Sequence, residues 1–305
     1  METLRSLVGD PEPFLGTAWR REARVLRPGA LPAQLVTLAD LDAALTGGLL
    51  RRPYLELVRG GQNLELDDFT SVRRVGAHEF PGYADPDKVL RRISSGATLL
   101  MRNIEHWHPG AAALCDRLSA ELGRPVEAFL FVTPPGEQGL GPHRDDADVF
   151  VVQLHGSKRW KVHGVPASGE WDAGYTPHPG SVVLETTVEP GQVLYIPRGA
   201  PHSAVGRSGG LSVHLSLTVR PPGTEALRAA LARHLDSELS LPSRPVDEAG
   251  LRGTAGELLD HYRERLGALT PEALCAAVES GVPDGPGTGT VDAPSLAALA
   301  DVLDA

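Results

Sequence analysis

The chain has 305 residues, of which 41% are hydrophobic and 22% are charged, proportions typical of a folded globular protein. Its net charge of −10 argues against a nucleic-acid partner, because phosphate contacts require clustered lysines and arginines. No stretch approaches the roughly 20 apolar residues of a membrane span, and the N-terminus has no signal-peptide pattern. The two cysteines, Cys115 and Cys275, fit a reducing compartment. We therefore expect a soluble, cytoplasmic protein with no membrane partner.

The first 125 residues predict two helices and one strand. Residues 1–80 mix proline and glycine with short apolar pieces and predict no long element. Residues 84–96 predict a helix, since Asp85 can cap its start and Gly96 can end it. A strand and a second helix follow, at 97–101 and 109–123.

Residues 126–220 have a different pattern, with short strands separated by turn residues. The predicted strands are Val126–Thr133, Val149–Leu154, Arg159–His163, Ser181–Val188, Val193–Ile196 and Leu211–Val219. None of the intervening segments is long enough for the helical crossover of a parallel sheet. We therefore expect a mainly β fold, either a sandwich or a barrel.

After Pro221 the pattern becomes helical again, which divides the chain into residues 1–220 and 221–305. Amphipathic helices are predicted at 224–239, 256–267 and 271–280, followed by a linker at 282–294 and a possible last helix at 295–303. This region holds 14 acidic residues against 6 arginines and no lysine. We interpret the excess charge as a solvated acidic face.

Three side chains form a candidate metal site. His143 and Asp145 are two residues apart, so both leave the same face if the segment is extended. His202 follows a predicted strand and the turn-rich segment 197–201, a hairpin-like return that can direct it across a barrel toward the first pair. A His-x-Asp pair by itself is common, and it gains weight here because each ligand lies beside strand and turn signals.

The chemistry of this ligand set favours iron(II). Two histidines and one carboxylate on one face of an octahedral ion leave three adjacent positions open for a co-substrate and O₂. A structural zinc site would instead use several cysteines, which the sequence does not offer at suitable spacing.

Lys158 is a candidate for binding a co-substrate carboxylate. Residues 148–163 are interpreted as a hairpin that turns at 155–157, on whose second strand Lys158 and Trp160 share one face and Lys161 lies on the other. An inward lysine needs an anionic partner, such as the distal carboxylate of 2-oxoglutarate. The alternative is a solvent-exposed hairpin lysine. The rarity of lysine, three against 26 arginines, favours the functional interpretation.

Residues 210–220 alternate strictly between apolar and polar side chains. The polar face consists of Ser212, His214, Ser216 and Thr218. An ordinary half-exposed strand would have this pattern. A strand that lines a co-substrate pocket would have it too, and both interpretations stay open.

Three segments together resemble a known family. GLGPHRDDADVFVVQLHGSKRWKVH (139–163), GQVLYIPRGAPHSA (191–204) and LSVHLSLTV (211–219) are similar to the Jumonji-C-type cupins that include the ribosomal oxygenases. The resemblance covers about residues 10–220. It implies a double-stranded β-helix (cupin, or jelly-roll) core with N-terminal flanking elements and a helical C-terminal extension.

The resemblance also implies a cofactor and roles for particular residues. Iron(II) would be held by His143, Asp145 and His202, with 2-oxoglutarate and O₂ as co-substrates. Lys158 occupies the position of the basic residue that binds the C5 carboxylate of 2-oxoglutarate, and Thr218 that of a Ser or Thr near the co-substrate. His214, on the same polar face, is a further candidate for co-substrate binding.

The sequence departs from this family in two places. Phe129 and Phe131 stand where relatives often have Asn and Tyr that help to hold 2-oxoglutarate, so a drier pocket is expected. The ribosomal oxygenases end in a helical dimerisation region followed by a winged-helix domain. Residues 221–305 have room for the helices, and for a possible homodimer, but hardly for the winged helix.

The expected function is therefore iron(II)- and 2-oxoglutarate-dependent hydroxylation. The substrate would be a protein side chain or a small molecule, such as an amino acid or a natural-product intermediate. Two alternatives remain at this point. A cupin metalloenzyme that does not use 2-oxoglutarate would not need an inward Lys158, and a non-catalytic binding module could share the same fold.

Overall fold

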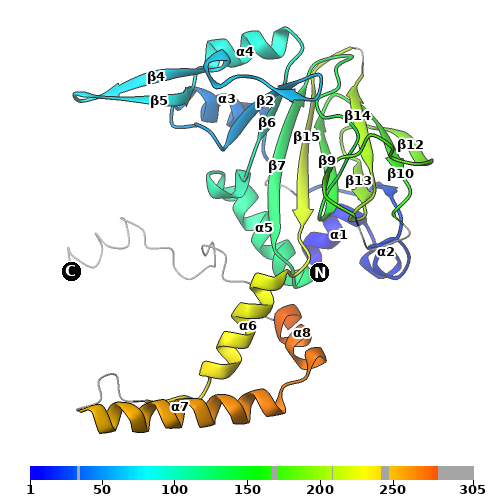
Figure 1. The fold of residues 1–305 in the computed structure, drawn as a ribbon. Coiled ribbons are helices and arrows are strands. Elements are labelled where there is room, and N and C mark those ends of the chain that lie inside the picture. The colour runs from blue at the N-terminus through cyan, green and yellow to red at the C-terminus, as the bar shows by residue number, and fades with distance from the viewer. Residues whose placement is uncertain (33–34, 167–170, 208, 242–246, 281–305) are drawn as a thin grey trace, which may run out of the picture. The chain divides into compact units, whose positions relative to one another are not determined.

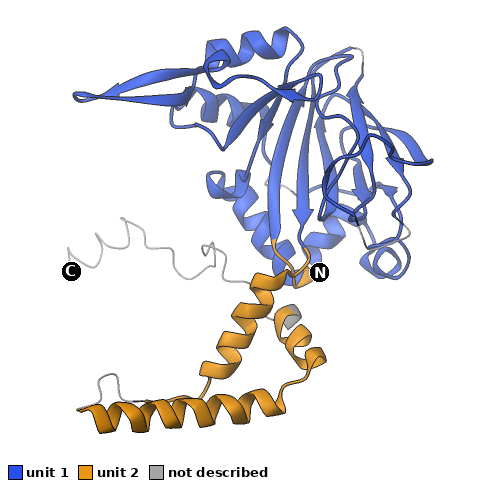
Figure 2. Ribbon diagram, viewed as in Figure 1, with its two compact units in different colours: residues 1–121, 126–220, 287–305 blue, residues 122–125, 221–286 orange. Residues whose placement is uncertain are grey.

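The computed structural model describes residues 1–32, 35–166, 171–207, 209–241 and 247–280. The chain forms two compact units, shown in Figure 2. The first contains residues 1–121 and 126–220, and the second contains residues 122–125 and the segment that starts at Pro221. The linker predicted at 282–294 and the helix predicted at 295–303 lie outside the described residues. None of the described helices combines the length and apolar character needed to cross a bilayer.

Two antiparallel sheets form the core of the first unit (Figure 1). The larger sheet has the order β1-β13-β9-β15-β7-β6-β2-β3, and the smaller has the order β11-β8-β14-β10-β12. The strands of the larger sheet are β1 (Arg24–Leu26), β2 (Leu55–Arg59), β3 (Gln62–Asn63), β6 (Thr98–Met101), β7 (Val126–Thr133), β9 (Asp148–His155), β13 (Val193–Ile196) and β15 (Ser212–Val219). Those of the smaller are β8 (His143–Arg144), β10 (Lys158–His163), β11 (Gly174–Tyr175), β12 (Val182–Val188) and β14 (His202–Gly206). A separate ribbon pairs β4 (Thr70–Val75) with β5 (His78–Ala84).

From β7 to β15 the chain passes repeatedly between the two sheets, which is the winding of a double-stranded β-helix and confirms the expected fold class. The interpretation of residues 148–163 as a hairpin is wrong, because β9 and β10 belong to different sheets. Both edges of β9 are already occupied, by β13 and β15. The turn at 155–157 therefore carries the chain from one sheet to the other. The return through 197–201 likewise joins β13 of the larger sheet to β14 of the smaller.

Strand β15 is buried along its whole length, so it is not the half-exposed strand that one interpretation allowed. It lies between β7 and β9 in the larger sheet. One of its faces packs into the apolar core, whereas the polar face is turned toward the smaller sheet, where the His214 ring lies 5.3 Å from that of Trp160 on β10. Burying alternate polar side chains in this way requires that they line a site or find partners.

Helices flank the larger sheet, including several in the N-terminal region where the sequence predicted no long element. They are α1 (Glu2–Val8), α2 (Pro11–Thr17), α3 (Leu38–Thr46), α4 (Pro86–Ser94) and α5 (Pro109–Leu122). Short local signals explain two of them: Thr37 and Asp40 form a capping box at α3, and Asp10 caps α2. The helices predicted at 84–96 and 109–123 are confirmed as α4 and α5, and Asp85 caps α4 as expected.

The second unit contains α6 (Thr224–Asp236), α7 (Glu248–Ala268) and α8 (Pro271–Ser280). Helix α7 begins eight residues earlier than the predicted helix at 256–267. Its first turns contain Gly250, Gly253 and Gly256, which disfavour a helix, but Asp247 caps its start by accepting a hydrogen bond from the Gly250 amide. Within this unit the Tyr262 hydroxyl of α7 donates to Asp236 of α6.

Candidate metal centre and its cavity

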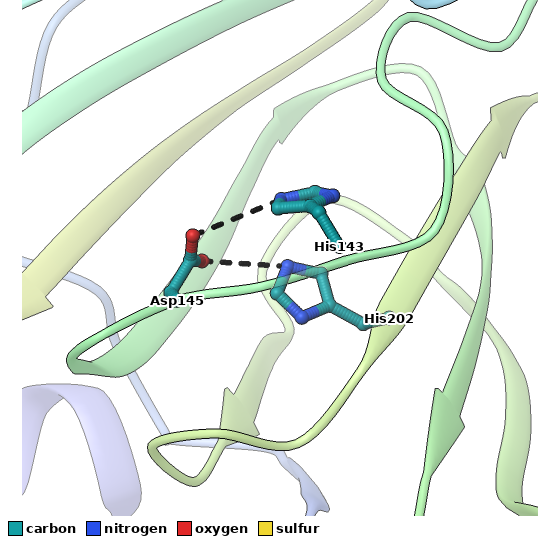
Figure 3. A group of neighbouring side chains, drawn as sticks. All are labelled: His143, Asp145 and His202. Carbon is teal, nitrogen blue, oxygen red and sulfur yellow. Dashed lines mark ion pairs between the residues drawn. The ribbon is translucent and has the colours of Figure 1, made fainter. Parts of the chain in front are cut away.

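His143, Asp145 and His202 come together on the smaller sheet, where β8 and β14 lie side by side (Figure 3). His143 on β8 and His202 on β14 are register partners in adjacent antiparallel strands, so their side chains leave the same face. Asp145 follows β8 directly. One potential ligand atom from each residue lies within 4.8 Å of the others. The structure thus brings together three residues that are up to 59 positions apart in the sequence.

Backbone carbonyls fix the orientation of both histidine rings. The Nδ1 atom of His143 lies 2.9 Å from the Gly141 oxygen, and that of His202 lies 3.0 Å from the Ala200 oxygen. A carbonyl oxygen can only accept a hydrogen bond, so Nδ1 must carry the proton in each ring. The lone pair that can bind a metal ion is then on Nε2 in both histidines. Metal-binding histidines are commonly oriented in this way, by a hydrogen bond from the other ring nitrogen to the protein.

The Nε2 atoms face the Asp145 carboxylate. His143 Nε2 lies 3.8 Å from Oδ1 and His202 Nε2 lies 3.5 Å from Oδ2. Burial, and next the neighbouring His143, lower the pKa of His202 to about 4, so this imidazole is neutral near pH 7. Three lone-pair-bearing groups that face one another repel unless a cation lies between them. The donor set therefore fits a divalent metal ion, and two imidazoles with one carboxylate suit iron(II) with open coordination positions.

A cavity of about 260 Å³ extends from these three residues between the two sheets. Its walls combine apolar and polar side chains in similar numbers. Besides the triad, the lining includes Glu56, Thr98, Leu100, Arg102, Phe129, Phe131, Leu140, Val149, Val151, Lys158, Trp160, His214, Ser216, Thr218 and Arg220.

Lys158 lies in this cavity and is 4% exposed, whereas Lys161 lies on the outer face of β10 beside Glu185. The predicted strand faces of the two lysines are therefore confirmed. The Lys158 ammonium donates to the Thr133 hydroxyl at 3.0 Å and lies between the rings of Phe131 and Trp160. Among the described residues no carboxylate pairs with it. Burial lowers the pKa of Lys158 to about 7, because the charged form has lost its water without gaining a counter-ion.

The remaining predicted residues are spread along the polar face of β15. His214 faces Phe131 and Trp160, next to Lys158. Thr218 also lines the cavity, but it lies six positions along the strand from Ser212, the register partner of Thr133. At roughly 3.4 Å a residue this is about 20 Å along the strand from the level at which Thr133 contacts Lys158. A role for Thr218 in co-substrate binding stays a prediction.

Sequence reasoning missed one ion pair in the cavity wall. Glu56 on β2 and Arg102, just after β6, form an ion pair of 2.7 Å, and both line the cavity. These strands extend the larger sheet beyond β7, so their inner face continues the floor of the cavity. No local pattern marks either residue, because the sequence around them resembles any short half-buried strand.

Comparison with known proteins identifies relatives of this chain. The sequence profile of the JmjC domain matches residues 101–227. Ribosomal oxygenase 1 from Rattus norvegicus is 29% identical over 259 residues, which are 79% of this chain and 42% of the relative. The bifunctional lysine-specific demethylase and histidyl-hydroxylase NO66 from Branchiostoma floridae is 28% identical over 74% of this chain and 36% of its own length. The chain thus spans about two fifths of the length of these curated relatives.

Solved structures agree on the fold. The Escherichia coli protein ycfD superposes with a TM-score of 0.54 at 21% identity, over 86% of this chain and 71% of that one. YcfD in complex with cobalt and 2-oxoglutarate, a ribosomal oxygenase from the same organism, gives a TM-score of 0.51 at 20% identity over the same shares. Residues 101–227 thus match the JmjC domain, and the chain is similar to ribosomal oxygenases in sequence and to ycfD in fold.

Proposed function

We propose that the chain is an iron(II)- and 2-oxoglutarate-dependent oxygenase that hydroxylates a side chain of a protein substrate. One juxtaposition supports this proposal above all. The same cavity holds a two-histidine, one-carboxylate ligand set and a buried ammonium group with no anionic partner among the described residues. A metal ion and a dicarboxylate are the two groups that would neutralise these charges.

Each part of the site has a defined task in this reaction. His143, Asp145 and His202 hold the metal ion, and the two backbone carbonyls behind the imidazoles keep their lone pairs directed toward it. When bound, iron(II), 2-oxoglutarate and O₂ supply the oxidising chemistry: 2-oxoglutarate becomes succinate and CO₂, and one oxygen atom enters a C–H bond of the substrate. Lys158 binds the distal carboxylate. The apolar side chains of Val149, Val151 and Phe129 exclude water from the reacting centre.

A protein substrate is supported by the relatives, which are named as ribosomal oxygenases and as a histidyl-hydroxylase. A cupin metalloenzyme that does not use 2-oxoglutarate would gain nothing from an unpaired, buried Lys158. We propose that residues 1–220 carry out catalysis and that the helical region 221–305 mediates dimerisation. We also propose a cytoplasmic location, which the free thiols of Cys115 and Cys275 support.

The test begins with the purified chain, iron(II), ascorbate, 2-oxoglutarate and air. Succinate should form slowly without substrate, and His143→Ala or His202→Ala should abolish both succinate formation and metal binding while the protein stays folded. Ribosomal proteins are then screened by mass spectrometry for a product that is 16 Da heavier. A wild-type chain that binds iron(II) but neither binds nor consumes 2-oxoglutarate would be a different cupin metalloenzyme. A chain that binds no metal would be a binding module.

A further inference from the structure

His214 is a buried polar residue that neither the metal site nor the fold explains. It is the third residue of β15, lines the cavity and is 1% exposed. Its Nδ1 atom is sealed from solvent and has no hydrogen-bond partner within the described part of the chain. Leaving a buried polar group unpaired costs about 1–3 kcal/mol, so an apolar side chain would serve packing better at this position.

The neighbouring polar residue on the same face makes the contrast clear. Ser212, two positions earlier on β15, accepts a hydrogen bond of 3.0 Å from the Gln153 side chain. Its burial is therefore compensated within the protein. His214 has no such partner, although it is equally enclosed. No hydrogen bond within the described part of the chain involves the other ring nitrogen, Nε2, so a partner for that nitrogen would come from outside the protein.

Aromatic rings hold the imidazole in one orientation. The Phe131 ring stacks on it in parallel, with centroids 4.8 Å apart and an interplanar angle of 5°. The Trp160 ring contacts it at 5.3 Å in an edge arrangement. The ammonium of Lys158 lies 5.8 Å from the Phe131 centroid and 5.7 Å from that of Trp160. Lys158 and His214 thus share the same two aromatic neighbours and lie on one side of the cavity.

The environment also determines which ring nitrogen can act. Because Nδ1 is sealed, the edge of the ring that reaches the cavity carries Nε2. Burial and the nearby Lys158 hold the pKa of His214 well below its usual value, so the ring is neutral and has a single N–H. A buried N–H without an acceptor is less favourable than a buried lone pair, which favours the proton on Nε2. Neither Phe131 nor Phe129 can offer a hydrogen bond beside it.

We propose that His214 donates a hydrogen bond to the distal carboxylate of 2-oxoglutarate and so acts with Lys158 as its second anchor. This inference rests on the proposed function. A carboxylate has about four lone-pair sites, so it can accept from both the ammonium and the imidazole. His214 is in this view a positioning residue, since it contacts only the end of the co-substrate that does not react. Its stack on Phe131 fixes the direction of the N–H.

The experiment compares two keto acids that differ only in the distal carboxylate. Affinities of the manganese-loaded protein for 2-oxoglutarate and for 2-oxobutyrate are measured by calorimetry in wild type, His214→Phe and His214→Gln. His214→Phe keeps an aromatic ring on Phe131 but removes the donor, and His214→Gln keeps an N–H. His155→Phe, on the exposed part of β9, is the matched control. Thermal unfolding monitored by circular dichroism verifies that each variant is folded.

We expect His214→Phe to weaken 2-oxoglutarate binding about tenfold or more and to leave 2-oxobutyrate binding within twofold of wild type. His214→Gln should recover part of the loss, and His155→Phe should change neither affinity. Unchanged 2-oxoglutarate binding in His214→Phe overturns the inference and leaves the proposed function intact. Equal weakening of both keto acids also overturns it, since that pattern indicates a packing role. A wild-type protein that binds no 2-oxoglutarate refutes the proposed function itself.

Discussion

At the residue scale, the site depends on charges that the fold buries without balancing them. Lys158 has a hydroxyl partner and two aromatic neighbours, and the triad has three lone-pair-bearing groups that face one another. Both arrangements cost stability in the free protein and are relieved by ligands of opposite charge. Buried charges without a counter-charge are typical of binding sites, because these sites are organised for the ligand rather than for the stability of the free protein.

Replacing Lys158 by alanine should raise the concentration of 2-oxoglutarate needed for half-maximal succinate formation by at least a hundredfold. Truncating one partner of a desolvated charge pair costs about 3–5 kcal/mol, because the other charge stays buried and unpaired. Lys161→Ala is the matched control, since this lysine lies on the opposite face of β10 in an exposed ion pair with Glu185. Similar effects of the two substitutions would contradict the role assigned to Lys158.

The affinity for 2-oxoglutarate should fall as the pH rises above 7. Burial lowers the pKa of Lys158 to about 7 in the free protein, whereas binding the carboxylate requires the ammonium form. Below pH 7 the charge is already present. Above pH 7 the protein must take up a proton on binding, so the dissociation constant should rise about tenfold per pH unit until the pKa of the complex is reached.

Calorimetry at pH 6.5, 7.5 and 8.5 with a bound divalent metal measures this slope. Lys158→Arg provides the control, because a guanidinium stays charged throughout the range and its affinity should vary little. An equally steep slope in Lys158→Arg would assign the pH dependence to another group.

At the scale of the elements, the site depends on turns that carry the chain between the sheets. The turn between β9 and β10 directs Lys158 and Trp160 inward, and it passes close to the beginning of β15 at Gly156. This glycine has φ +58°, and a Cβ built on it would lie 2.1 Å from the backbone oxygen of Leu211. A backbone atom cannot move aside as a flexible side chain can, so the close approach requires glycine.

Gly156→Ala should lower the free energy of unfolding by about 2 kcal/mol or more and weaken 2-oxoglutarate binding, because both the backbone and β10 must shift. Gly191→Ala is a suitable comparison: its φ is +86°, but no atom lies within 4 Å of the added carbon. That variant should cost only about 1 kcal/mol. Chemical denaturation of both variants distinguishes steric conflict from backbone strain alone. Equal losses would show that the contact with Leu211 is easily relieved.

At the scale of the whole molecule, the helical region from Pro221 onward is a candidate dimerisation region. Helix α7 exposes Leu251, Leu259 and Leu266 at 57%, 52% and 49%. Tyr262, on the same helix, instead contacts α6 of the same unit. The exposed leucines are candidates for an interface between two copies of the chain, because an isologous dimer would bury each of them twice.

If these helices form a homodimer, the full chain should scatter light as a species of twice 32.4 kDa at tens of micromolar. Replacing Leu259 and Leu266 together by aspartate should give monomers, since a carboxylate is strongly disfavoured in a buried apolar interface. Leu90→Asp alters a similarly exposed leucine, at 51%, on α4 and should leave the dimer intact. A full-length chain that is monomeric under these conditions would contradict the prediction.

Sequence alone was sufficient for features that depend on local physics. The strands over 126–133 and 193–196, the helix capped by Asp85 and the opposite faces of Lys158 and Lys161 follow from periodicity, capping and alternation. His143, Asp145 and His202 could be nominated as a metal site because their residue types and turn signals already carry the chemistry. The short N-terminal helices escaped prediction, since each has seven to nine residues and is stabilised largely by packing.

Tertiary structure decided what depends on contacts between distant segments. Whether residues 148–163 form a hairpin or cross between sheets cannot be read locally, since the same turn serves both and the occupied edges of β9 decide it. The addition of Glu56 and Arg102 to the cavity wall follows only from the extension of the larger sheet by β6 and β2. That Nδ1 of His214 has no hydrogen-bond partner among the described residues is likewise a consequence of tertiary packing. A sequence specifies which groups are present, whereas the fold determines which of them are enclosed together and which are left without a partner.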